Sequence, residues 1–405
     1  MNEALYKARI ARVQSELTRR QLDGMIVIKP EHVRYLAGVW GYSTRTEYAM
    51  PRRLIALIVP KHGDVTLIVP KIEVNFARRR TWVSDVRYHV EWASQSSEVF
   101  GGLNLLDQVL TEKGLQRSRL GVELGFVSVR LFSLMSEQFA HVRFEEAATI
   151  IEELRMIKSA EEIETMRIGA RMAVAEFELE SAAVRPGIRE YELAQIGRDE
   201  ATRLAAQYAV ARQPADTIAL EHPLNESSQI ITSGERLDMI HALASTRTIS
   251  EGDVVLLDFC RVPQLESYRI GFSRNVALRP LSAEEKDMYD VVMHSYDAAL
   301  SALKPGLPAE GPDVIARDIL ETAGLADTFA HRTGRGVGLE GVEGPEIGAG
   351  DKRPLQPGMV VTVEPSVYYQ GFAVHVEDTY LITEDGHELL TRCPREIKII
   401  RNERA

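Results

Sequence analysis

The sequence predicts a two-domain protein of mixed α/β structure, and three observations support this. Its 405 residues exceed what one hydrophobic core usually organises. The first third alternates strand-like and helix-like segments, which is typical of an α/β domain. From residue 151 the pattern changes to a long helical segment rich in charged residues. We therefore expect one domain over 1–154 and a second over 155–405.

The first domain begins with a helix and a strand. Apolar residues at helical spacing predict a helix over 4–20, and the apolar run 24–28 predicts a short buried strand. Two further apolar runs, 53–60 and 64–70, are separated by Lys61-His62-Gly63. This arrangement predicts a β-hairpin, with the glycine where a positive φ is needed.

The second domain begins with helix over 151–184, where Glu and Arg recur four residues apart. The helix is interrupted at Lys158-Ser159. Ser159 followed by Glu162 is the signature of a capping box, so a new helix should begin there. Pro-Gly pairs further along the chain predict turns.

Composition limits the class of protein. Apolar residues make up 45% of the chain and charged residues 26%, values typical of a folded soluble protein. A net charge of −11 is unfavourable for nucleic-acid binding, and the N-terminal segment resembles neither a signal peptide nor a membrane span. Two cysteines cannot form a disulfide framework. We expect a cytoplasmic enzyme that acts on a small molecule, without nucleic-acid or membrane partners.

Three acidic residues occupy unusual positions in the second domain. Asp258 and Glu364 each end a β-rich run that starts with a glycine, at Gly252 and Gly358, and Glu377 lies inside another such run. A buried carboxylate without a partner is costly, so each needs a cation, a donor or a proton. The repeated pattern is either a coincidence or a duplicated unit that presents two carboxylates to one cavity. Three such acids together favour a functional site over separate structural ion pairs.

At these residues the chain resembles the creatinase and prolidase family. The resemblance implies the fold class α/β (α+β), with an N-terminal creatinase-like α/β domain, a C-terminal pita-bread catalytic domain, and a homodimer. It is carried by Arg155 to Lys158, His241 after Ser233-Gly234, Gly252-Asp253, Gly334-x-Gly336-x-Gly338-Leu339, Glu364-Pro365 and Glu377-Asp378.

The metallopeptidases of this family bind two divalent metals through Asp, Asp, His, Glu and Glu, in chain order. The resemblance places Asp258, Glu364 and Glu377 at the first, fourth and fifth positions, but Gly271 and Arg335 at the second and third. Glycine has no donor atom, and a guanidinium has no lone pair for a metal. We therefore expect no cofactor and no two-metal centre, although a single metal held by the three carboxylates remains open.

Without the two-metal set, the resemblance to creatinase implies a metal-independent hydrolase. Its substrate would be a small zwitterionic or cationic amino-acid derivative with a C–N bond to break, as in creatinase or ectoine hydrolase. His241 matches the creatinase histidine and is expected to act as acid and base. Glu364 and Glu377 would position water and a cationic group, and Arg335 would balance their charge.

The same resemblance suggests the substrate-binding residues. Asp258 and Ser273 are expected to contact the substrate, although creatinase has a glutamate at the position of Ser273. His375 stands where the family usually has arginine, two residues before Glu377, and should support it. Arg52 would hold a substrate carboxylate across the dimer, unless it is simply a solvated surface residue.

Other classes remain open on the sequence alone. The chain could be a metallopeptidase of the Xaa-Pro dipeptidase or aminopeptidase P type with a degraded metal site, a non-catalytic binding relative, or a lyase. Residues 336–341 match the dinucleotide pattern G-x-G-x-x-G by letter only, because they follow a helical segment rather than a strand. We expect no NAD.

Overall fold

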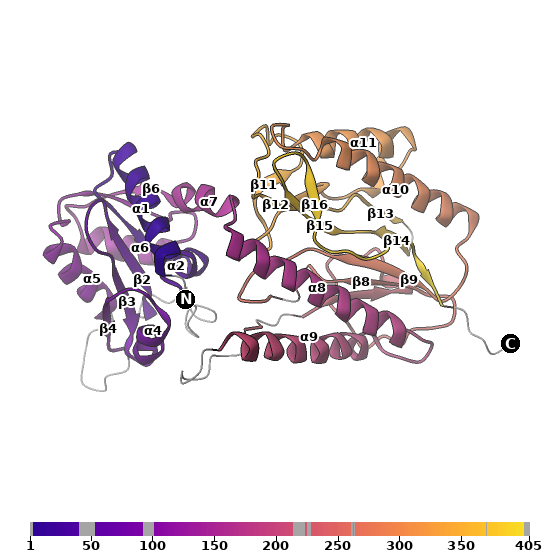
Figure 1. The fold of residues 1–405 in the computed structure, drawn as a ribbon, viewed down its shortest axis with the longest axis horizontal. Helices are drawn as coiled ribbons and strands as arrows, with labels where there is room; N and C mark the ends of the chain where they lie inside the picture. Colours follow the sequence, from indigo (N-terminus) through magenta and orange to yellow (C-terminus); the bar gives the residue numbers. More distant parts are fainter. Residues whose placement is uncertain are drawn as a thin grey trace. The chain divides into compact units, whose positions relative to one another are not determined.

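The computed structural model describes residues 3–39, 53–91, 101–213, 223–224, 228–260, 262, 264–369 and 371–400. The chain divides into two compact units, Met1–Arg155 and Met156–Ala405, both built from helices and sheets (Figure 1). The predicted mixed α/β class is confirmed. No helix in the described ranges combines the length and apolar character that crossing a membrane requires.

The first unit is built on one six-stranded sheet, in the order β4-β3-β2-β1-β5-β6. Strands β2 and β3 pair antiparallel, which confirms the predicted hairpin, and Gly63 between them has a φ of 89°. The strands are β1 (Gly24–Val27), β2 (Ala56–Pro60), β3 (Thr66–Pro70), β4 (Asp85–His89), β5 (Arg119–Val122) and β6 (Arg143–Glu146). The helices are α1 (Glu3–Arg19), α2 (Pro30–Ala37), η2 (Lys71–Glu73), α4 (Val74–Arg80), α5 (Gly101–Glu112), α6 (Val129–Gln138) and α7 (Ala148–Met156).

The helices of the second unit lie on both sides of its strands. Helix α9 contacts β7, whereas α10 contacts β12, β13 and β14 on the other side (Figure 1). The predicted break before α8 is confirmed, because the Ser159 hydroxyl and the Glu162 side chain form a complete capping box. The helices are α8 (Ala160–Ala183), α9 (Glu190–Arg212), η3 (Gly234–Arg236), α10 (Ala283–Ala302), α11 (Gly311–Thr322) and η4 (Ala326–Thr328).

Three sheets make up the strands of the second unit. Their orders are β17-β9-β8-β7, β11-β10-β12-β15-β16 and the pair β13-β14. The strands are β7 (Ile230–Ser233), β8 (Val254–Asp258), β9 (Ser273–Ala277), β10 (Gly334–Gly336), β11 (Glu343–Ile347), β12 (Val360–Val363), β13 (Ser366–Tyr369), β14 (Phe372–His375), β15 (Asp378–Ile382), β16 (His387–Leu389) and β17 (Lys398–Ile399).

The two larger sheets meet where the acidic residues lie. Asp258 ends β8, Glu364 follows β12, and Glu377 lies between β14 and β15. An isolated β-bridge joins Ser273 at the start of β9 to Glu377, and so ties the β8–β9 sheet to the edge of β15. The repeated glycines before β8 and β12 both have a positive φ. The backbone therefore carries all three carboxylates to one region.

Candidate active site

The second unit contains a cavity of about 520 Å³ where these strands end. Asp258 and Glu364 both line it, as expected for a repeated unit that presents two acids to one cavity. Of the eight predicted site residues, five line it: His241, Asp258, Arg335, Glu364 and His375.

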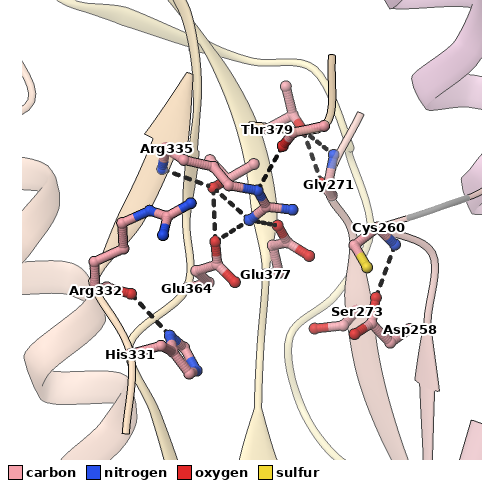
Figure 2. Close-up of polar contacts among 12 residues, drawn as sticks. Asp258, Cys260, Gly271, Ser273, His331, Arg332, Arg335, Glu364, Glu377 and Thr379 are labelled. Atoms are coloured by element: carbon pink, nitrogen blue, oxygen red, sulfur yellow. Dashed lines mark hydrogen bonds and ion pairs between the residues drawn. The ribbon is translucent and has the colours of Figure 1, made fainter. Parts of the chain in front are cut away.

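Arg335 lies at the centre of the polar cluster. Its Nη1 donates to Oε1 of Glu364 and to Oε1 of Glu377, the latter at 2.9 Å (Figure 2). Its Nε donates to the carbonyl oxygen of Gly341 at 2.7 Å, which fixes the plane of the guanidinium. Only 8% of Arg335 is exposed. A buried guanidinium thus binds two carboxylates at once.

Arg335 separates the acidities of its two partners. Burial raises the pKa of Glu364, but the Arg335 guanidinium, His375 and His331 together outweigh burial and hold that pKa well below its usual range. Burial, followed by repulsion from Glu364, raises the pKa of Glu377 to about 8, although Arg335 opposes the shift. Near neutral pH Glu364 therefore carries the charge and Glu377 a proton.

Asp258 and Ser273 lie on the β8–β9 side of the site (Figure 2). Oδ1 of Asp258 accepts a hydrogen bond from the backbone N–H of Cys260 at 2.7 Å. Burial raises the pKa of the Cys260 thiol far above its usual value, so that thiol is a poor nucleophile. The Ser273 hydroxyl is fully buried and donates to the carbonyl oxygen of His375 at 3.2 Å.

Two histidines are linked through a tyrosine. Nε2 of His331 and Nδ1 of His375 each lie 3.1 Å from the Tyr368 hydroxyl. Nδ1 of His331 lies 2.8 Å from the carbonyl oxygen of Arg332 (Figure 2). Burial lowers the pKa of His331. Burial also opposes protonation of His375, but Glu364 and Asp258 outweigh it and raise the pKa of His375.

Sequence reasoning missed His331. It lies three residues before the glycine motif at Gly334, and that proximity was its only signal. His241 is exposed in the turn region after η3 and lines the same cavity. Arg52 lies outside the described residues, so its contact with a substrate carboxylate stays a prediction.

A buried ion pair holds the backbone of Glu377. Nη1 of Arg274 donates to the carbonyl oxygen of Glu377 at 2.9 Å, and Nη2 donates to Oδ1 of Asp378 at 2.7 Å. Asp378 also accepts from Tyr296 at 2.9 Å and from Nε of Arg395 at 2.8 Å. These donors position the strand end that carries Glu377.

The family's two-metal centre does not fit these residues. A Cβ atom at Gly271 would lie 2.0 Å from Oε1 of Glu377 and 2.5 Å from Cγ2 of Thr362, so a ligand side chain has no room there. The Arg335 guanidinium lies between Glu364 and Glu377, the carboxylates that would have to share the metals (Figure 2). A fixed cation at that place repels a metal ion and offers it no lone pair.

Comparison with known proteins covers nearly the whole chain. Residues 9–157 match the Creatinase/Prolidase N-terminal domain, and residues 164–384 match Metallopeptidase family M24. An Xaa-Pro dipeptidase from Pyrococcus furiosus is 28% identical, over 96% of this chain and 99% of that protein. The structure of an Xaa-Pro dipeptidase from Bacillus anthracis is 26% identical with a TM-score of 0.81, covering 98% of this chain and all of that one. A prolidase from Thermococcus sibiricus is 27% identical with a TM-score of 0.81, over 98% and 99% of the two chains.

These matches overturn the function expected from the sequence. The prediction of a metal-independent, creatinase-like hydrolase is wrong, because the family is one of metallopeptidases and the matched proteins are Xaa-Pro dipeptidases and prolidases. The error arose from treating the loss of two ligand positions, at Gly271 and Arg335, as the loss of metal chemistry altogether. The findings favour the alternative of an Xaa-Pro-type peptidase.

The resemblance and the fold it implied are confirmed. An N-terminal creatinase-like domain precedes a C-terminal pita-bread domain, as in the matched prolidase and dipeptidase structures. The chain belongs to metallopeptidase family M24.

Proposed function

We propose that the protein hydrolyses the C–N amide bond of small dipeptides, with Xaa-Pro dipeptides as its first substrate class. The observation that carries the proposal is the end-to-end match with an Xaa-Pro dipeptidase, which spans 96% of this chain and 99% of that protein. A cavity of about 520 Å³ is consistent with a small substrate.

The charges around the cavity suit the two ends of a dipeptide. Asp258 and the ionised Glu364 line the cavity and would attract the substrate ammonium group. Arg269 lines it too, and its Nε has no hydrogen-bond partner among the described residues. Arg269 is therefore available to the substrate carboxylate, together with Arg52 if that residue reaches the site.

His241 is the proposed proton carrier. Water attacks the carbonyl carbon, the C–N bond breaks, and the proton lost by water ends on the leaving nitrogen. An exposed imidazole at the cavity can take that proton and return it. Arg335 and Glu377 act as positioning residues, because Arg335 holds the Glu364 carboxylate and Glu377 holds Arg335.

The test is release of free proline from Gly-Pro, Ala-Pro and Leu-Pro, with Leu-Ala and creatine as comparison substrates. The protein is assayed as purified and with added Mn²⁺, Co²⁺ or Zn²⁺. We expect proline release, and a loss of at least about 100-fold for His241→Ala. His294→Ala is the matched control, because His294 is exposed on α10, away from the cavity-lining residues. Dipeptide binding without product under every condition would refute hydrolysis and favour a binding relative.

A further inference from the structure

Three side chains near Glu364 form a set of metal-ligand type. They are His331 before β10, Glu364 after β12, and His375 at the end of β14. One ligand atom from each lies within 4.8 Å of the other two. Two imidazoles and one carboxylate are a common ligand set for Zn²⁺ and neighbouring divalent transition metals.

The hydrogen bonds around the histidines show which ring nitrogens carry lone pairs. With Nδ1–H of His331 donating to the Arg332 carbonyl, Nε2 of His331 carries the lone pair, which accepts from the Tyr368 hydroxyl and which a metal ion would have to take over. The Tyr368 oxygen then accepts from Nδ1–H of His375, which leaves the lone pair of His375 on Nε2. Outer hydrogen bonds of this kind fix the ring tautomer at metal sites.

Nε2 of His375 has no hydrogen-bond partner in the part of the chain that the structure describes, and only 4% of the residue is exposed. Oε2 of Glu364 lies 3.6 Å from this nitrogen. Two acceptors that face each other in a buried site need a shared proton or a cation between them. Ligands of a tetrahedral zinc ion lie about 3.3 Å apart, so this spacing suits a shared ion.

Glu364 is shared between Arg335 and the proposed ion. Glu364 can serve both partners, because Arg335 occupies Oε1 while Oε2 faces His375.

Two departures from the family pattern, at Arg335 and His375, amount to an exchange of one arginine and one histidine. The family's ligand histidine is Arg335 here, and the arginine usual before the last glutamate is His375. Imidazole and guanidinium have changed places on either side of Glu364. The nitrogen ligand is therefore moved rather than lost.

We propose that the chain binds one divalent transition-metal ion through His331, Glu364 and His375, displaced from the two-metal position of its family. Closing the ligand triangle to zinc geometry requires its longest edge to shorten by at most about 1.5 Å, which side-chain rotation can supply. The proposal concerns ion binding and does not depend on the substrate proposed above.

The test begins with the full chain, stripped by chelator and titrated separately with Zn²⁺, Co²⁺ and Mn²⁺. Elemental analysis after dialysis gives the stoichiometry, and visible absorption of the Co²⁺ form gives its coordination. We expect one ion per chain. His375→Arg and His331→Gln should weaken binding by more than about 100-fold. Tyr368→Phe should weaken it by about 10–100-fold, because the Tyr368 hydroxyl hydrogen-bonds to both histidines but is not itself a ligand.

Asp258→Asn separates the displaced site from the family's own site. Asp258 belongs to the family ligand set but not to the proposed one, and its carboxylate lies 4.0 Å from Nδ1 of His375. This variant should therefore still hold one ion per chain, with a smaller loss of affinity than His375→Arg. Circular dichroism and thermal melting of each metal-free variant establish that it is folded. The proposal would be overturned if the chain held no stoichiometric ion or held two ions. It would also be overturned if folded Asp258→Asn lost the ion or if folded His375→Arg kept it. Dipeptide cleavage is measured separately, so a failed metal site and a failed substrate assignment give different results.

Discussion

Replacing Asp378 by Asn should destabilise the second unit strongly. Asp378 and Arg274 form an ion pair in which the side chains are 0% and 1% exposed. Removing one charge of a buried pair leaves the other unpaired and costs about 3–5 kcal/mol. For a unit of about 250 residues, roughly 2 °C per kcal/mol predicts a fall in Tm of about 8 °C.

The assay is urea unfolding and calorimetry of Asp378→Asn beside Asp297→Asn. Asp297 lies 3.8 Å from Arg395, and its side chain is 67% exposed. The same chemical change at that exposed pair should cost under about 1 kcal/mol. If Asp378→Asn cost no more than Asp297→Asn, the argument that the buried pair holds the Glu377 strand end would be refuted.

Three further predictions concern pH and local packing. Burial raises the pKa of Glu176 and Glu180 far above the value in the unfolded chain. The free energy of unfolding should therefore fall as pH rises above about 4.3, the pKa of an unperturbed glutamate. Glu180→Gln should flatten that fall in urea titrations at pH 5 to 8. Gly271→Ala should cost about 1–3 kcal/mol of unfolding free energy, because its Cβ would overlap the Glu377 carboxylate; an unchanged urea midpoint would contradict this. Ser159→Ala should lower stability by about 0.5–2 kcal/mol in the same assay, because it removes the N-cap of α8, and no loss would mean that the cap is redundant.

Local chemistry explains which parts of the fold were predictable. The hairpin β2–β3 and the start of α8 depend on Gly63 and on the Ser159 capping box, whose effects extend over a few residues. The meeting of Asp258 and Glu364 was also readable, because a glycine turn and strand alternation fix where each acid points. Pairings between residues distant in sequence could not be predicted, and the bridge from Ser273 to Glu377 is one of these pairings.

The site shows where motif reading fails. Arg335 was expected to balance charge, but sequence alone could not place one of its nitrogens on both Glu364 and Glu377. His331 carried no pattern of its own, and its importance depends on Tyr368 from another strand. Spacing along the chain does not encode such contacts, because they form only when the sheets meet.

The error about reaction class has the same origin. A family motif records which residue type stands at which position, whereas a metal responds to donor atoms in space. Arg335 in place of a ligand histidine looks like a lost donor, but His375 brings an imidazole to the other oxygen of the same Glu364 carboxylate. One guanidinium and one imidazole still flank that carboxylate, so its local charge is unchanged by the exchange. Under the proposed displaced site, what has changed is the side on which a cation would be held, so two missing ligand positions need not make the site metal-free.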